Sequence, residues 1–197
     1  MLWATWLQAI GTILAFVAVA IQIRRESADR KRIQQRMDQA DLREQSSQIF
    51  AWAAILSEDD ARQLGLAGMD TQGIFVVNAS QLPIYDVVLS LVLIRGAGPH
   101  TGEQLVALGP EVADRDRVVR SVLPPGRWFV SFPNSSWGAR SSMPGGEIAF
   151  NDSAETSWVR RVSGSLEQLS QNPLDALSVN RPFPEARLEN LDPNRIQ

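Results

Sequence analysis

The chain has 197 residues, a formal net charge of −3 and no cysteine. The lack of cysteine excludes disulfide bonds, zinc sites built on thiolates and cysteine nucleophiles. Residues 45–197 carry twelve basic and seventeen acidic side chains, and this acidic excess argues against nucleic acid as a partner. The length leaves room for one membrane span and one domain of ordinary size.

An uncharged, largely apolar segment runs from Leu2 to Ile23. As a helix rising ~1.5 Å per residue it would be about 33 Å long, enough to cross a hydrocarbon core of about 30 Å. Trp3 and Trp6 stand where interfacial aromatic side chains are common. We therefore predict a transmembrane helix at residues 1–23, which contacts the lipid bilayer through Leu2–Ile23.

A basic cluster follows this segment directly. It contains Arg24, Arg25, Arg30, Lys31, Arg32 and Arg36, interrupted by two acidic residues. Because basic flanks stay on the cytoplasmic side of a membrane, we expect a single-pass protein of the cell membrane. Its N-terminus would lie outside and its C-terminal domain in the cytoplasm.

A cleavable signal peptide is the alternative reading of the same segment, because Ala18-Val19-Ala20 resembles an A-x-A cleavage site. Two features favour an uncleaved anchor instead. No lysine or arginine precedes the apolar run, and the run is longer than the roughly 7–15 apolar residues usual in signal peptides. The sequence alone leaves cleavage open.

Residues 24–46 are rich in helix formers and free of glycine and proline, which predicts a polar helical stalk. Ile33, Met37 and Ala40 share one helix face and indicate a short coiled coil, but the next seam positions would be Glu44 and Ser47. A solvated stalk is therefore favoured over a stable zipper. Small residues in the span, with this seam, also leave room for a homo-oligomer through span or stalk.

Alternating apolar residues after the stalk predict a β domain at residues 47–170. Residues 47–56 fit either a helix end or a first strand, and their β-forming side chains favour a strand. Val87, Leu89, Leu91 and Leu93 fall on one face of a strand, with Asp86 and Ser90 on the opposite face, and give the clearest strand signal. Strands are predicted at residues 73–79, 85–94, 103–108, 116–123, 127–132, 146–151, 156–162 and 165–169.

Glycine- and proline-rich turns separate these strands, at Gly96–Pro99, Pro124–Gly126 and Pro144–Gly146. About seven or eight short antiparallel strands with such spacing predict an immunoglobulin-like β-sandwich. Residues 58–73 read as a connection. The proline-rich segment 171–197 lacks apolar periodicity and is expected to be a disordered tail.

Three stretches carry a resemblance to known sequences. They are Asn78-x-Ser80 with Pro83-Ile84-Tyr85-Asp86-Val87, the turn Leu123-Pro124-Pro125-Gly126, and Phe150-x-Asp152 with Trp158-x-Arg160. In these stretches the chain resembles uncharacterised single-span bacterial membrane proteins with a C-terminal β-sandwich-like domain. The resemblance implies no known activity. Glu155-Thr156 stands in the hairpin where a glycine would be expected.

No catalytic or cofactor motif stands out in the chain. The one histidine, His100, has no nucleophile or metal ligand near it in sequence. The acidic clusters Glu58-Asp59-Asp60 and Asp114/Asp116 match no calcium loop and are read as solvated. We therefore expect no catalytic, cofactor-binding or metal-binding residues, no cofactor and no enzyme activity. The N-x-S sequons at Asn78 and Asn134 have meaning only in an exported domain.

The sequence thus favours a membrane-tethered module that presents a cytosolic β-sandwich to an unknown protein partner. The alternative is an exported cell-envelope β-domain, either anchored or released after signal cleavage. An enzyme that uses carboxylates such as Asp152, Asp86 or Glu58 is the third and least favoured class. Partner identity and oligomeric state cannot be read from these residues.

Overall fold

The computed structural model describes residues 43–63, 71–132 and 143–191. The chain divides into two compact units, Met1–Arg43 and Glu44–Gln197. In the described ranges, no helix combines the length and the apolar character needed to cross a membrane. The predicted span at residues 1–23 and nearly all of the predicted stalk at 24–46, including its coiled-coil positions, lie outside the described residues. Residues 43–47 are helical.

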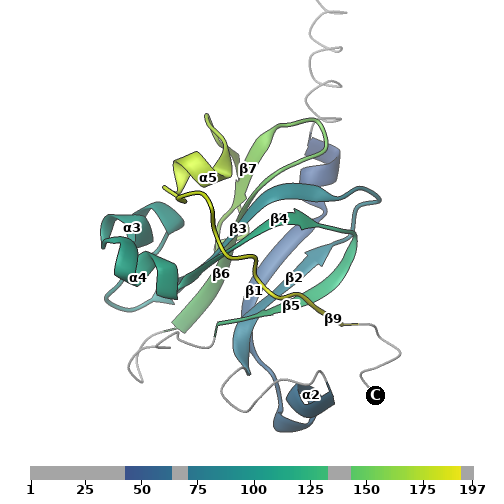
Figure 1. Ribbon diagram of the computed structural model, residues 1–197, viewed down its shortest axis with the longest axis vertical. Helices are drawn as coiled ribbons and strands as arrows, with labels where there is room; N and C mark the ends of the chain where they lie inside the picture. The colour runs from purple at the N-terminus through teal and green to yellow at the C-terminus, as the bar shows by residue number, and fades with distance from the viewer. Residues whose placement is uncertain (1–42, 64–70, 133–142, 192–197) are drawn as a thin grey trace, which may run out of the picture. The chain divides into compact units, whose positions relative to one another are not determined.

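Two antiparallel sheets make up the second unit (Figure 1). The first sheet has the order β1-β2-β5-β9, with β1 at Ile49–Ile55, β2 at Gln72–Asn78, β5 at Gly126–Ser131 and β9 at Glu189–Asn190. The second has the order β4-β3-β6-β7-β8, with β4 at Arg117–Leu123, β3 at Ile84–Arg95, β6 at Met143–Asn151, β7 at Ser157–Arg160 and β8 at Leu166–Gln168. The mainly β prediction is confirmed, and the two sheets are consistent with a β-sandwich.

The main core lies between the sheets, where alternate residues of each strand point inward. Ile74 and Val76 come from the first sheet, and Val87 and Leu89 from the second, all at most 2% exposed. Phe150 and Trp158 are equally buried beside them. The period of two in residues 85–94 therefore placed Val87 and Leu89 on the correct face.

The second sheet is buried on its outer face as well, which the sequence pattern did not reveal. Val88 and Val159 on that face pack against Leu174 and Leu177 of the helix α5 (Pro173–Ala176) and its C-cap. Ser90, predicted on the polar face of its strand, is only 1% exposed. A polar residue on a strand therefore does not mark a solvated face here.

The expected strand at residues 103–108 is wrong, because these residues form the helix α3 (Gly102–Ala107), which α4 (Pro110–Arg115) follows. Thr101 caps α3 by accepting a hydrogen bond from the backbone N–H of Gln104 through its side chain. Residues 58–73, read as a connection, contain the short helix α2 (Glu58–Gln63). The strand favoured at residues 47–56 is confirmed as β1.

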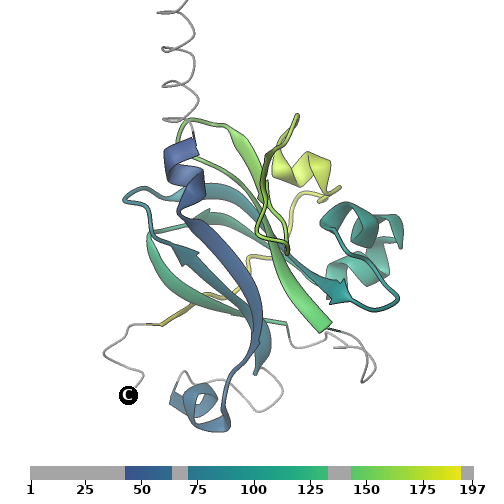
Figure 2. The ribbon, with the colours of Figure 1, turned by 180° about the vertical axis from the view of Figure 1, so that it is seen from behind.

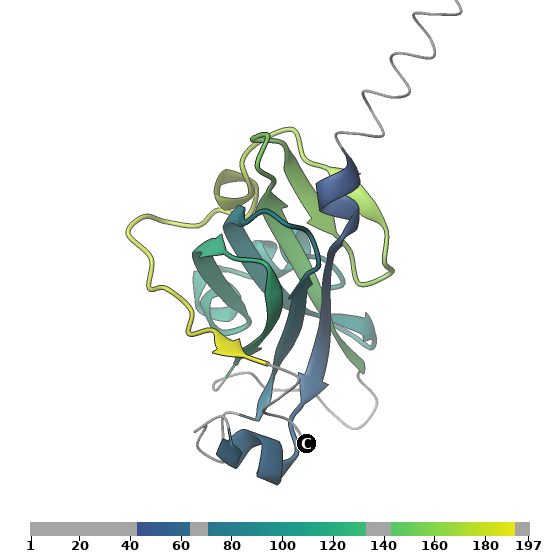
Figure 3. The same cartoon turned by 90° about the vertical axis from the view of Figure 1, so that its right-hand side faces the viewer.

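The expectation of disorder from residue 171 onward does not hold for residues 171–191. This segment forms α5, then runs as a strap along the open side of the two sheets to β9, which pairs with β5 (Figure 3). On the way the backbone N–H of Ala186 donates to the carbonyl of Val119 on the edge strand β4. Proline at the start of α5 is compatible with a helix, because the first turn needs no N–H donor there. Residues 192–197 lie outside the described residues.

Candidate functional site

The three stretches that carry the sequence resemblance meet at one end of the sandwich. The β2–β3, β4–β5 and β6–β7 connections, at residues 79–83, 124–125 and 152–156, all lie there, because antiparallel neighbours turn at the same end of a sheet. Residues 44–48 lead into β1 at this same end (Figure 2). We call it the loop end.

Asn78 and Ser80 fix the first of these loops. Both side chains are buried, and the Oδ1 atom of Asn78 accepts hydrogen bonds from the backbone N–H of Ser80 at 3.1 Å and from its hydroxyl at 2.6 Å. The Asn78 amide donates to the carbonyl oxygens of Leu82 and Leu123 at 2.9 and 3.3 Å. Asn78 is thus a structural residue that ties two loops together, and its buried amide does not suit a glycan. Asn134 lies outside the described residues.

Asp152 organises the β6–β7 loop. Its carboxylate is 2% exposed and accepts hydrogen bonds from the backbone N–H groups of Ala154 and Thr156, each at 2.9 Å, and from the Trp158 indole at 2.8 Å. Three donors satisfy a buried charge that would otherwise be costly. Glu155 in this loop adopts a left-handed backbone with φ of 61°.

Asp86 is the most unusual residue of the loop end. It interrupts the β3–β6 register with φ of 47°, a conformation that few L-residues adopt. Its Oδ2 atom accepts hydrogen bonds from the side-chain amides of Asn151 at 3.0 Å and Asn172 at 2.7 Å. Two neutral amides thus orient a carboxylate, and no ion pair with it occurs among the described residues. Backbone strain of this kind often accompanies function.

Two hollows meet at Asp86. The first has a volume of about 640 Å³ and is lined by Tyr85, Asp86, Asn151, Asp152, Ser153, Glu155, Ser157 and Asn172. The second has a volume of about 580 Å³ and is lined by Asp86, Ser121, Arg181, Pro182, Phe183 and Glu185. We call the first the Asp86 hollow. It carries three carboxylates, and its lining contains no basic side chain.

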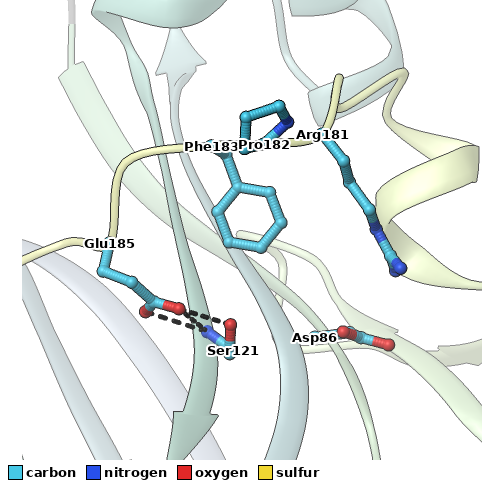
Figure 4. Close-up of a pocket in the computed structure, with 6 residues that line it drawn as sticks. All are labelled: Asp86, Ser121, Arg181, Pro182, Phe183 and Glu185. Carbon is cyan, nitrogen blue, oxygen red and sulfur yellow. Dashed lines mark hydrogen bonds between the residues drawn. The ribbon is translucent and has the colours of Figure 1, made fainter.

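The second hollow differs in charge. Figure 4 shows the Arg181 side chain extending toward Asp86, with the ring of Phe183 on the same segment as Arg181. Glu185 is held away from them, because its carboxylate accepts hydrogen bonds from the backbone N–H and hydroxyl of Ser121. Arg181 therefore places a positive charge beside a region that is otherwise acidic.

A second polar cluster lies on the outer face of the second sheet and was not predicted from the sequence. The Arg161 guanidinium contacts the carboxylates of Glu103 at 2.7 Å, Glu147 at 3.2 Å and Glu167 at 3.0 Å. Glu147 is 1% exposed and also accepts a hydrogen bond from the backbone N–H of Gly102 at 2.7 Å. The cluster fastens α3 to the sheet, so we assign it a structural role.

Glu147, Glu103 and Arg161 of this cluster have shifted pKa values. Burial raises the pKa of Glu147 above its ordinary value, although Gly102 and Arg161 oppose the shift. Burial also acts to raise the pKa of Glu103, but the hydrogen bonds from Arg161, from its own backbone and from Thr101, together with the charge of Arg161, outweigh burial, and the net pKa is lowered. The Arg161 guanidinium, although partly desolvated, has a raised pKa because of its carboxylate neighbours, so it stays charged.

The other residues singled out in the sequence do not gather at the loop end. His100 is exposed, with Nδ1 2.6 Å from the carbonyl oxygen of Leu93. Glu58 and Asp59 form ion pairs with Arg62 within α2, and Asp114 and Asp116 form ion pairs with neighbouring arginines. Among the described residues, no group of three or more histidine, aspartate and glutamate side chains could hold a metal ion.

Comparison with known proteins adds no relative: no family model, no curated protein and no solved structure matches this chain. The function must therefore be argued from the loop end itself. Both serine hydroxyls that line the Asp86 hollow are already engaged, since Ser157 donates to Asn151 at 2.7 Å and Ser153 to Gln45 at 2.7 Å. The Asp86 hollow offers oriented acceptors and negative charge, which suit binding better than bond cleavage.

Proposed function

We propose that this protein is a single-pass membrane protein that presents its β-sandwich in the cytoplasm as a protein-interaction module. The uncharged segment Leu2–Ile23 and the basic cluster after it support the anchor and its orientation. A helical stalk at residues 24–46 would hold the sandwich away from the bilayer. The resemblance to single-span bacterial membrane proteins belongs to the same proposal.

The strand order supports an immunoglobulin-like type of sandwich. In chain order, β1, β2 and β5 share one sheet, while β4, β3, β6 and β7 share the other. This matches strands A, B and E in one sheet and C′, C, F and G in the other. The loop end then corresponds to the end that carries the B–C and F–G loops, which serve binding in variable domains. That step is an analogy between folds.

The observation that carries the binding role is the oriented, unpaired carboxylate of Asp86 between two hollows. A partner segment that presents a basic side chain in the Asp86 hollow would supply the close ion pair that Asp86 does not form with Arg181, and partly desolvated ion pairs are stronger than exposed ones. A backbone carbonyl of the same segment would accept from the N–H and hydroxyl of Ser153 in place of Gln45. A peptide with a lysine or arginine is therefore the partner chemistry that we propose.

Topology and processing provide the first test of the anchor. A reporter that is active only in the cytoplasm, fused after Gln197, should be active, and a reporter that is active only outside should be silent. The opposite pattern would support the exported cell-envelope domain in place of the cytosolic module. N-terminal sequencing of the mature protein separates an anchored form from a cleaved one, because cleavage after Ala20 removes the span.

A further inference from the structure

Gln45 joins the end of the first described helix to the wall of the Asp86 hollow. Its Oε1 atom accepts hydrogen bonds from the backbone N–H of Ser153 at 2.9 Å and from the Ser153 hydroxyl at 2.7 Å. Ser153 itself lines the hollow. We infer that a ligand in the Asp86 hollow is sensed at residues 44–48 through the Ser153–Gln45 contact. This inference rests on the proposed binding role of the hollow.

Gln45 connects two loops at once. While its carbonyl oxygen holds Ser153, its amide donates to the backbone carbonyls of Leu82 at 3.3 Å and Pro83 at 3.0 Å. The β2–β3 and β6–β7 loops are thus bridged by a single side chain from the segment that precedes β1. Displacement of either loop must break or bend at least one of these hydrogen bonds.

Arg160 provides a second attachment that does not involve the hollow. Its guanidinium donates to the carbonyl oxygens of Ser46 at 3.1 Å and Ser47 at 3.0 Å, and also to that of Ile49. It lies over the ring of Phe50, with 4.8 Å between the guanidinium carbon and the ring centroid. A cation at the last carbonyls of a helix is favourable. Arg160 therefore acts as a pivot for residues 44–48, and Gln45 as a latch.

The latch is open to competition by a ligand. In the described structure, Ser153 has no hydrogen bonds other than those to Gln45. A carbonyl or carboxylate oxygen in the hollow would compete with Gln45 for the same N–H and O–H donors, as a peptide backbone next to a basic side chain at Asp86 would. Asp152 would hold the loop in place meanwhile, because its three hydrogen bonds are buried or partly buried. Binding would then release Gln45 from Ser153, while Arg160 keeps its hydrogen bonds to the carbonyl oxygens of residues 46, 47 and 49.

Coupling between two sites is reciprocal. If the Asp86 hollow and residues 44–48 are coupled, a substitution at either one should change the other, and this can be measured without a partner. We would compare hydrogen exchange in the full-length chain, purified in detergent, with exchange in three variants. Ser153→Ala removes one latch bond, and Gln45→Ala removes the latch entirely. Ser157→Ala is the matched control, because Ser157 lines the same hollow but bonds Asn151 instead of Gln45.

We expect Ser153→Ala to speed exchange of the amides in residues 44–50 about five-fold, the factor for one ordinary hydrogen bond, and Ser157→Ala to leave it unchanged. Gln45→Ala should speed exchange in both residues 44–50 and residues 152–156. Equal effects of Ser153→Ala and Ser157→Ala at residues 44–50 would overturn the coupling. So would unchanged exchange at residues 152–156 in Gln45→Ala. Because no partner is added, these results stand apart from any test of binding.

Discussion

At the scale of single residues, the loop end is marked by two acidic side chains in left-handed backbone conformations. Asp86 has φ of 47° and Glu155 has φ of 61°. Aspartate tolerates this region better than most residues, but glutamate has no such preference. The sequence hinted at the second case, because Glu155-Thr156 stands where a hairpin would take glycine. It gave no sign of the first, since Asp86 is surrounded by strand-forming residues.

The strain at Glu155 predicts that Glu155→Gly stabilises the protein. Glycine adopts positive φ without the steric cost of a Cβ atom, and this gain exceeds its greater loss of backbone entropy on folding. We expect the free energy of unfolding to rise by about 1 kcal/mol. Chemical denaturation of the parent and variant chains measures it. Glu155→Val should lower stability instead, and a stable Glu155→Val chain would rule out the strained backbone.

Glu147 predicts a pH dependence with a definite sign. Because burial raises its pKa in the folded state, the folded protein holds this proton more tightly than the unfolded chain. Its contribution to stability is therefore full below the ordinary glutamate pKa and is lost as pH rises through the raised pKa. Glu147→Gln, which mimics the protonated acid, should gain stability relative to the parent as pH rises from 4 to 8.

Glu103 serves as the control for this pH series, because it contacts the same guanidinium and has a lowered pKa. Its contribution is present above the ordinary glutamate pKa and is lost as pH falls through the lowered value. Glu103→Gln should therefore lose stability relative to the parent at neutral pH and little at low pH. Thermal unfolding at several pH values measures both variants, and slopes of the same sign would contradict the assigned roles.

At the scale of elements, the strands could be predicted from the sequence and the short helices could not. The period of two in residues 85–94 predicted the inward face of β3, and the other strands were predicted from short apolar runs between turns. Residues 103–108 are two polar residues followed by four apolar ones, and so short an apolar run fits a helical turn as well as a strand. The deciding signal was local: Thr101 stands three residues before Gln104, the spacing of a helix capping box.

The cap at Thr101 predicts a measurable loss on substitution. Thr101→Ala removes the acceptor for the backbone N–H of Gln104, which is 3.3 Å from the hydroxyl oxygen. We expect a loss of about 1 kcal/mol in the free energy of unfolding, as for other N-caps. Thr101→Ser, which keeps the hydroxyl, should retain most of the stability. If both variants were equally destabilised, the methyl group and not the cap would be the important part of the side chain.

The candidate site was harder to predict than the fold, because it depends on contacts between distant segments. Asp86 is oriented by Asn151 and by Asn172, which comes from the segment expected to be disordered. Likewise, Arg160 holds carbonyl oxygens of residues 46, 47 and 49, more than a hundred positions away. The three resembling stretches did mark this end of the fold. No periodicity or local motif could have shown that Asn151 and Asn172 meet at the Asp86 carboxylate.

At the scale of the whole described domain, the C-terminal segment completes the fold. Leu174 is 1% exposed and packs with Val88, Ala149 and Val159 on the outer face of the second sheet. Low periodicity misled the sequence reading here, because a strap and a single helical turn bury residues without repeating a pattern. The prolines suit such a strap, since it needs few backbone N–H donors.

Truncation of Leu174 tests this integration. Leu174→Ala should lower the free energy of unfolding by about 2–4 kcal/mol, the usual cost of a cavity at a buried leucine. Leu108→Ala is the control, because Leu108 is 56% exposed and its removal should cost little. Denaturant unfolding compares the two. Equal stability of both variants would mean that residues 171–191 are not part of the folded domain and form the disordered tail expected from the sequence.

The most direct test of the proposed role is photo-cross-linking from the Asp86 hollow in living cells. Tyr85 lines the hollow and is 40% exposed, so a benzophenone amino acid can replace it conservatively. We predict a discrete cross-linked protein from position 85, weakened by Asp86→Asn and absent when the label stands at position 108. Identical adducts from both positions, or an adduct at position 85 that Asp86→Asn leaves unchanged, would contradict an interaction module centred on Asp86.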